Sequence, residues 1–162
     1  MQQILITERA HDLLVAAARA AWPNETGGVV LGVTAGRRPW ITTPVELPGP
    51  RGPGHYVVPR GATSTAVKEA RNSDPRLGYL GEWHSHTDHQ GPSSEDRAAM
   101  RMIGWYARRP PLGGPLLIVV RRCADGQQAP SAYVARFPVL RPAELVLTGP
   151  LRAPLPNQRI TE

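Results

Sequence analysis

The sequence has a single cysteine and no long hydrophobic run. Cys123 has no second cysteine to pair with, which excludes an intramolecular disulfide and a small disulfide-stabilised secreted domain. No apolar stretch approaches the roughly 18 residues that a membrane-spanning helix needs. Residues 1–14 lack the basic segment and the small-residue cleavage site of a secretory signal. We therefore expect a cytoplasmic protein with no membrane partner.

Lysine is nearly absent as well. Lys68 is the only lysine among 19 basic residues, so arginine supplies the rest of the basic charge behind a net charge of +6. Positive charge raises nonspecific affinity for phosphates. The arginine excess accompanies 18 prolines and 16 glycines, and it indicates a compositional bias of the whole chain. No basic motif carries interleaved aromatic residues, so we do not expect a nucleic-acid partner.

The length of 162 residues, 41% of them hydrophobic, fits one globular domain with its own core. We expect this domain over residues 1–148 and a C-terminal tail over 149–162. Apolar runs and helical spacings, separated by turn residues, predict an α/β domain with a mixed sheet. The expected elements are strand 4–6, helix 8–21 capped by Thr7, strands 27–33 and 40–47, helix 62–72, strand 77–86, helix 93–108, and strands 116–120 and 132–137.

The same patterns predict which side chains face the core. We expect Trp22 and Trp105 in the core or at its edge. Segment 48–54 is too rich in proline and glycine for a regular element and should form a mobile surface loop. The expected inner stripes are Leu13, Leu14, Ala17, Ala18 and Ala21 on the first helix, and Ala99, Met102, Ile103 and Tyr106 on the third.

Three of the five histidines lie within residues 84–89, among the carboxylates of Glu82, Asp88, Glu95 and Asp96. His84 and His86 are two apart at the end of a predicted strand, so both imidazoles project from one face and could share a metal ion. Asp96, at the start of the next helix, is well placed as a third ligand. Two histidines and one carboxylate would leave a fourth position open for water, as in a catalytic zinc site.

Each of these signals has a simpler interpretation. An isolated His-x-His is weak evidence for a metal, and Ser93 with Asp96 fits a helix-capping pattern. The two interpretations of Asp96 are compatible. A hydrolytic site also needs a general base, for which Glu25 is the best remote candidate, because burial at the start of an apolar strand would raise its pKa. The alternative is a solvated glutamate in the loop after the first helix.

Taken together, these residues resemble the JAMM (JAB/MPN-domain) zinc metalloproteases. The resemblance rests on Glu25-Thr26-Gly27-Gly28, His84-Ser85-His86 and Ser93-x-x-Asp96, and it extends from residue 4 to about residue 137. The preceding residues 78–83, GYLGEW, are similar to the bacterial branch. The resemblance implies a single JAB/MPN-type domain, with a mixed, mostly antiparallel curved sheet flanked by helices.

The resemblance also implies roles for single residues. His84, His86 and Asp96 would hold one zinc ion, Glu25 would be the acid/base, and Ser93 would hydrogen-bond the attacking water or the developing oxyanion. The chain departs from the commonest family pattern in two ways. The spacer between His86 and Ser93 has six residues instead of seven, and Thr87 stands where proline is usual. Neither change removes a ligand, so we expect activity to survive.

Members of this family cleave after the C-terminal glycine of ubiquitin or a ubiquitin-like protein, which is the partner implied here together with its conjugates. The compact form resembles deconjugating proteases that accompany ubiquitin-activating-like and ubiquitin-conjugating-like enzymes in antiphage operons. Two alternatives remain: a peptidase that trims sulfur-carrier proteins, and a non-catalytic scaffold. We expect segment 33–54 to shape the groove for the substrate tail.

Other residues near the cluster have simpler interpretations. We expect His89 to be an exposed loop histidine, and Glu82 and Trp83 to be strand and packing residues. Six arginines and no acidic residue lie within residues 97–122, a strip that we interpret as a solvated helix face or a docking surface for a partner.

Overall fold

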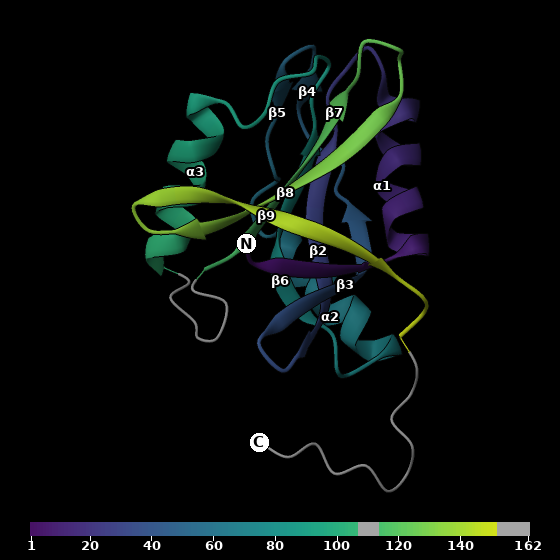
Figure 1. Cartoon of the computed structure of the whole chain (residues 1–162), viewed down its shortest axis with the longest axis vertical. Coiled ribbons are helices and arrows are strands. Elements are labelled where there is room, and N and C mark those ends of the chain that lie inside the picture. The colour runs from purple at the N-terminus through teal and green to yellow at the C-terminus, as the bar shows by residue number, and fades with distance from the viewer. Residues whose placement is uncertain (107–113, 152–162) are drawn as a thin grey trace, which may run out of the picture.

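The computed structural model describes residues 1–106 and 114–151. Its centre is a closed barrel in which parallel and antiparallel pairs mix (Figure 1). Strand β1 pairs in parallel with both β3 and β9, and β6 pairs in parallel with β7, whereas the other neighbours are antiparallel. The expected fold class, an α/β domain with a mixed and curved sheet, is confirmed. The strands are, in barrel order, β1 (Gln3–Thr7), β3 (Arg38–Glu46), β2 (Gly27–Ala35), β6 (Gly78–Ser85), β7 (Leu116–Arg122), β8 (Gln128–Arg136) and β9 (Val139–Thr148).

Strand β9 closes the barrel, and the sequence analysis did not predict it. It pairs with β1 in continuous register from Gln3–Glu144 to Thr7–Thr148. The strand is hard to recognise because Pro142 lies within it and because none of its side chains is fully buried. Residues 152–162 of the expected tail lie outside the described residues.

Helix α1 (Glu8–Ala21) packs into the largest apolar cluster of the barrel. Its N-terminus is capped as predicted, because the Ala10 amide donates to Thr7 Oγ1 at 3.1 Å. Leu14 and Ala18 are buried against β1, β2 and β7 residues of that cluster. Leu13 is 47% exposed, so its predicted place on the inner stripe is wrong.

Helices α2 (Ala62–Ser73) and α3 (Ser94–Tyr106) cover other parts of the sheet. Helix α2 packs on Val29 and Leu31 of β2, and α3 packs on Leu117 and Val119 of β7. These strand residues alternate with the ones that face α1, so the central strands are buried on both sides.

The buried face of α3 differs from the predicted one. Met100 is buried and Ile103 packs beside it, whereas Met102 is 65% exposed and its predicted inward orientation is wrong. The side chains of Trp105 and Tyr106 lie outside the described residues. Within the described ranges, no helix is long and apolar enough to cross a membrane.

The proline- and glycine-rich segment after β3 is more regular than expected. Strands β4 (Arg51–Gly52) and β5 (His55–Tyr56) pair in a two-stranded sheet, with Gly54 in the left-handed region at φ 71°. The Gly52 carbonyl accepts the Glu25 amide at 3.0 Å. The expectation of no regular element here is therefore wrong, because β4 and β5 form a hairpin. This hairpin also holds the segment that carries Glu25.

Trp22 also departs from its expected place. Its side chain is 45% exposed, and the Arg122 guanidinium lies over its ring, 3.8 Å from the centroid. A cation over the face of an indole ring is favourable, which explains how this large side chain is accommodated outside the core.

Candidate metal centre

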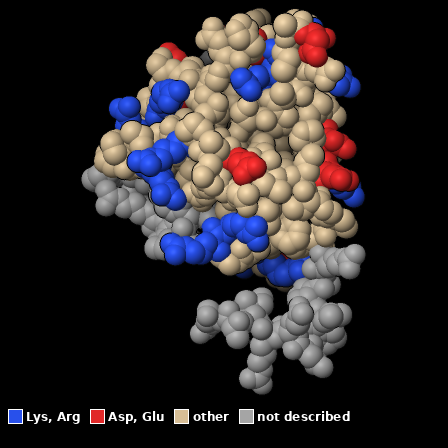
Figure 2. Space-filling model, in the orientation of Figure 1, with Lys and Arg blue, Asp and Glu red and all other residues tan. Residues whose placement is uncertain are grey.

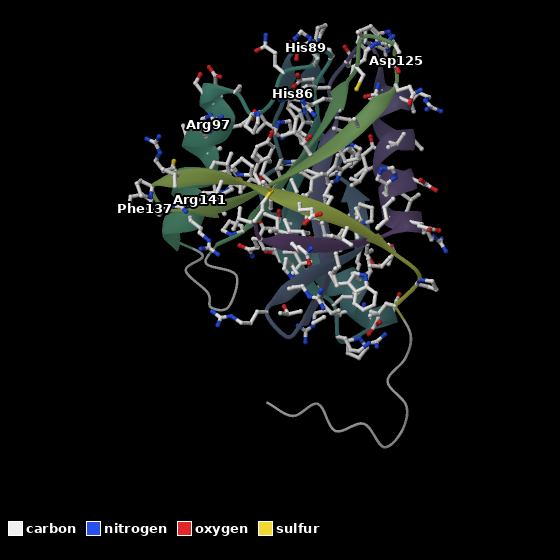
Figure 3. The ribbon with its side chains drawn as sticks, in the orientation of Figure 1. His86, His89, Arg97, Asp125, Phe137 and Arg141 are labelled. Carbon is white, nitrogen blue, oxygen red and sulfur yellow. The ribbon has the colours of Figure 1, made fainter. Side chains whose placement is uncertain are left out.

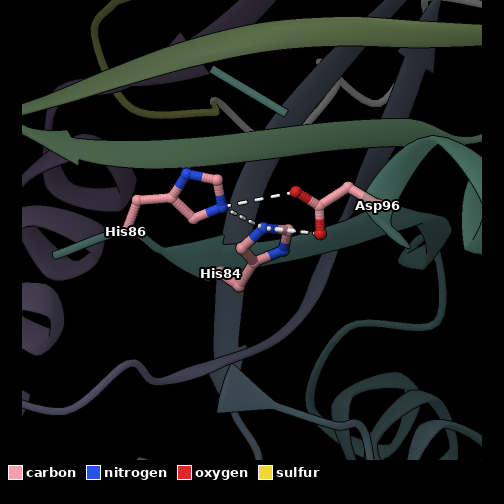
Figure 4. A group of neighbouring side chains, drawn as sticks. All are labelled: His84, His86 and Asp96. Carbon is pink, nitrogen blue, oxygen red and sulfur yellow. Dashed lines mark hydrogen bonds and ion pairs between the residues drawn. The ribbon is translucent and has the colours of Figure 1, made fainter. Parts of the chain in front are cut away.

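His84, His86 and Asp96 converge on one point, as Figure 4 shows. The two histidines come from the end of β6 and the loop after it, and Asp96 lies in the first turn of α3. His84 Nε2 is 3.1 Å from Asp96 Oδ1, and His86 Nε2 is 3.3 Å from Asp96 Oδ2. The two Nε2 atoms are 3.0 Å apart.

This donor set fits a divalent metal ion. Ligand atoms at tetrahedral angles and 2.0–2.1 Å from zinc lie about 3.3 Å from one another, which is close to the separations observed here. The His86 Nδ1 atom lies 3.1 Å from the Gln90 carbonyl oxygen. A proton held on Nδ1 by this carbonyl leaves the Nε2 lone pair directed at the shared point. His84, His86 and Asp96 are thus the residues that could hold a metal.

Asp96 and His86 each shift the pKa of the other. Burial alone would raise the pKa of Asp96, but hydrogen bonds from His84 and His86 hold that pKa well below its usual range. Burial would lower the pKa of His86, yet the Asp96 carboxylate and the Gln90 carbonyl raise it. The Asp96 carboxylate therefore attracts both imidazoles.

Ser93 and Asp96 bond to each other reciprocally at the N-terminus of α3. The Ser93 amide donates to Asp96 Oδ2 at 2.6 Å, and the Asp96 amide donates to Ser93 Oγ at 3.1 Å. This arrangement is a capping box with aspartate in the third position. The same carboxylate reaches both histidines, so the capping and ligand interpretations of Asp96 hold together.

Glu25 lies in the loop between α1 and β2 and is 9% exposed. The alternative of a solvated loop glutamate is therefore wrong. Burial raises the pKa of its carboxyl group, against the opposing influence of His86 and His84. The electrostatic influence of these histidines indicates that Glu25 lies near them.

Ser85, between the two histidines, is a residue of the site to which the sequence analysis gave no role. Its Oγ accepts the Thr26 amide at 2.9 Å, and its own amide donates to the Thr26 carbonyl at 2.7 Å. The β2–β6 register places Gly27 opposite His84. Alternation along β6 already indicated that Ser85 faces away from the histidines, toward the interior.

The six-residue spacer after His86 is tied to strand β7. The Arg122 amide donates to the Asp88 carbonyl at 2.9 Å, and Arg121 Nη1 donates to the His89 carbonyl at 3.4 Å. The side chain of His89 is exposed, as expected, and Figure 3 shows it at the same end of the molecule as His86. The shortened spacer is therefore held to β7 by these hydrogen bonds and to His86 by the Gln90 carbonyl.

The arginine-rich strip does not form one continuous face in the described part of the chain. Arg97 and Arg101 are exposed on α3, whereas Arg121 and Arg122 are partly buried at the end of β7. Residues 108 and 109 lie outside the described residues. Figure 2 shows basic side chains gathered on the side of the molecule where Figure 3 places Arg97 and Arg141.

Fold and site together define a single α/β domain with a His-His-Asp metal-ligand group at a strand end and a buried glutamate nearby. The sequence matches the family described as prokaryotic homologs of the JAB domain over residues 7–134, and the chain belongs to this family. The family includes peptidases and non-catalytic members.

Solved structures share this fold. Protein DSY2949 from Desulfitobacterium hafniense is similar with a TM-score of 0.71 and 23% identity, over 91% of this chain and 94% of that one. AF2198, a JAB1/MPN domain protein from Archaeoglobus fulgidus, is similar with a TM-score of 0.53 and 18% identity, over 90% of this chain and 99% of that one. No protein with a curated function matches the sequence significantly.

Proposed function

We propose that this protein is a zinc-dependent peptidase or isopeptidase that cleaves after the C-terminal glycine of a ubiquitin-like protein. The observation that carries the proposal is the convergence of His84 Nε2, His86 Nε2 and the Asp96 carboxylate near the buried Glu25. A scaffold would need no such set of ligands beside a carboxyl group of raised pKa. The complete set, with Ser93, therefore favours a peptidase over a non-catalytic member of the family.

His84, His86 and Asp96 would hold one zinc ion, which would act as a Lewis acid toward the scissile carbonyl and lower the pKa of water. Glu25 would take the proton from the attacking water and deliver it to the leaving amine nitrogen. Its burial supports this role, because burial raises the pKa of the Glu25 carboxyl group and so makes it a better proton acceptor.

Ser93 would stabilise the developing oxyanion. Its Oγ accepts the Asp96 amide, so the hydroxyl hydrogen is available for donation. The neighbouring Glu95 carboxylate accepts the Ser94 hydroxyl at 3.0 Å. In the proposed reaction the Ser93 hydroxyl would donate to the oxygen on which charge develops.

An extended C-terminal tail suits the surroundings of Glu25. Segment 46–56 lies next to the site, because Gly52 bonds to Glu25 and because Thr26 Oγ1 donates to Glu46 Oε1 at 2.5 Å. A tail could add to this segment through backbone hydrogen bonds. The turn at Gly36, by contrast, lies at the far end of β2 from His84, so the part of segment 33–54 that could shape the groove is the later one.

The test is cleavage of a ubiquitin-fold protein that ends in Gly-Gly and is fused to a reporter. We expect one zinc per chain and a product whose mass ends at glycine. Glu25→Gln should keep the zinc and lose cleavage, whereas His84→Ala should lose both. Glu69→Gln on α2 is the matched control and should behave as wild type. Full activity of Glu25→Gln would overturn the mechanism.

We further propose that the substrate and its conjugates belong to a bacterial ubiquitin-like pathway of antiviral defence, with the ubiquitin-activating-like and ubiquitin-conjugating-like enzymes as partners. This part rests on the resemblance of the compact chain to deconjugating proteases of such operons. The neighbouring genes test it, because genes of sulfur metabolism in their place would favour trimming of a sulfur-carrier protein.

A further inference from the structure

A cavity of about 380 Å³ opens beside the metal-ligand group. Its volume is in the range of pockets that hold small ligands or single side chains. Most of its wall is apolar, and it lies between α3, strands β6 and β7, and the residues that follow β5. The apolar walls come from Val57, Val58, Ala99, Met100, Ile103 and Leu117.

Glu82 lies in this mostly apolar wall. It precedes His84 by two residues on β6, so both side chains project from the same face of the sheet. Its neighbours across the strands are Val29 and Leu117, neither of which can pair with a carboxylate. Within residues 1–106 and 114–151, no hydrogen bond or ion pair is found for the Glu82 side chain, which sequence reasoning had interpreted as a packing residue.

Three carboxylate side chains line the cavity: Glu82, Glu95 and Asp96. Glu95 lines it near the N-terminus of α3, and none of the described residues that line it is a lysine or an arginine. A carboxylate removed from water without a partner is costly, and a cation brought by a ligand removes that cost. Apolar walls with an acidic group match the chemistry of a lysine or arginine side chain, whose methylenes pack on apolar surface while the charged end pairs.

We propose that this cavity is a specificity pocket for a basic side chain in the substrate tail, and that Glu82 pairs with its charged end. The inference rests on the proposed peptidase function. His84 and Asp96 line the same cavity, so the basic residue lies within a few residues of the scissile bond. This basic residue belongs to the substrate tail and is not the target lysine, because the lysine of an isopeptide bond loses its charge when it is acylated.

The test uses acetylated pentapeptides that end in Gly-Gly, carry a coumarin amide, and have arginine or leucine at each of the three preceding positions, with alanine elsewhere. For the zinc-loaded wild type, we expect kcat/KM to be about tenfold higher for arginine than for leucine at one position. Glu82→Gln should reduce this ratio to near one, mainly by lowering kcat/KM for the arginine peptides. Glu82→Arg should invert the preference toward a peptide with glutamate at that position. Glu69→Gln should keep the wild-type ratio.

Two results would overturn the pocket. One is equal cleavage of the arginine and leucine peptides by the wild type. The other is an equal loss for all peptides in Glu82→Gln, which would indicate a structural role. Fluorescence anisotropy of the same peptides separates this proposal from the peptidase: arginine-selective binding that requires Glu82, without cleavage, would support the pocket and overturn the proposed function. The arginine preference should also weaken as salt rises.

Discussion

The Thr26 amide donates a hydrogen bond to Ser85 Oγ at 2.9 Å and joins the start of β2 to the end of β6. Both residues are buried, and the Ser85 amide returns a bond to the Thr26 carbonyl. Glu25 directly precedes Thr26, and His84 and His86 lie on either side of Ser85. The pair therefore fixes the proposed base relative to two proposed ligands, although neither Thr26 nor Ser85 belongs to the ligand set.

Replacement of Ser85 by alanine should separate positioning from metal binding. The change leaves the buried Thr26 amide without its side-chain acceptor, which costs about 1–3 kcal/mol of stability. It leaves the ligand atoms intact, so one zinc should still bind. Because Glu25 would be less well fixed, kcat for the proposed cleavage should fall about tenfold with KM little changed.

Urea denaturation, zinc content and steady-state kinetics of Ser85→Ala measure these three effects. Ser64→Ala, at an exposed position on α2, is the matched control and should change none of them. Loss of zinc in Ser85→Ala would show that the serine supports the ligands rather than the base.

Much of the site could be predicted from the sequence because its residues lie in short local patterns. The spacing of His84 and His86 follows from strand alternation, and the place of Asp96 follows from helix capping. The location of Glu25 beside them depends on the pairing of β2 with β6, which no local pattern specifies. The resemblance to a family supplied that link.

The parts that sequence reasoning missed depend on long-range packing. Strand β9 is stabilised by β1, which lies more than a hundred residues earlier in the chain, and its own pattern is interrupted by Pro142. On α3, helical spacing placed Met102 on the inner stripe, whereas packing against β7 buries Met100 instead. The hairpin of β4 and β5 forms where Gly52 also binds Glu25, a contact that composition cannot reveal.

Gly27 should not tolerate a side chain. A Cβ atom there would lie 2.4 Å from the Trp83 carbonyl oxygen and 2.7 Å from the Tyr56 ring. Because the carbonyl belongs to the paired strand, Gly27→Ala should separate β2 from β6 and destabilise the protein by about 1–3 kcal/mol. Gly78→Ala is the control, since its Cβ would have no neighbour within 4 Å. Equal urea midpoints for the two variants would contradict this packing.

The two leucines in the middle of α1 should differ strongly. Leu14 is fully buried in the barrel cluster, whereas Leu13 is half exposed. Leu14→Ala should cost about 2–5 kcal/mol, because it leaves a cavity. Leu13→Ala should stay within about 0.5 kcal/mol, as is usual for surface substitutions. The two free energies of unfolding, measured side by side, check the orientation of the helix, and the reverse order would require α1 to be rotated.

Zinc should stabilise the folded chain through the three converging side chains. A metal that binds only the folded state at a hundredfold excess over its Kd raises the free energy of unfolding by about 2.7 kcal/mol. We expect that gain when zinc is returned to chelator-treated wild type, and its absence in His86→Ala. His89→Ala is the matched control, because this exposed histidine lies three residues away and outside the ligand group. It should respond to zinc as wild type does. An equal gain in His86→Ala would mean that the metal binds elsewhere, and an unchanged wild type would remove the metal from the proposed mechanism.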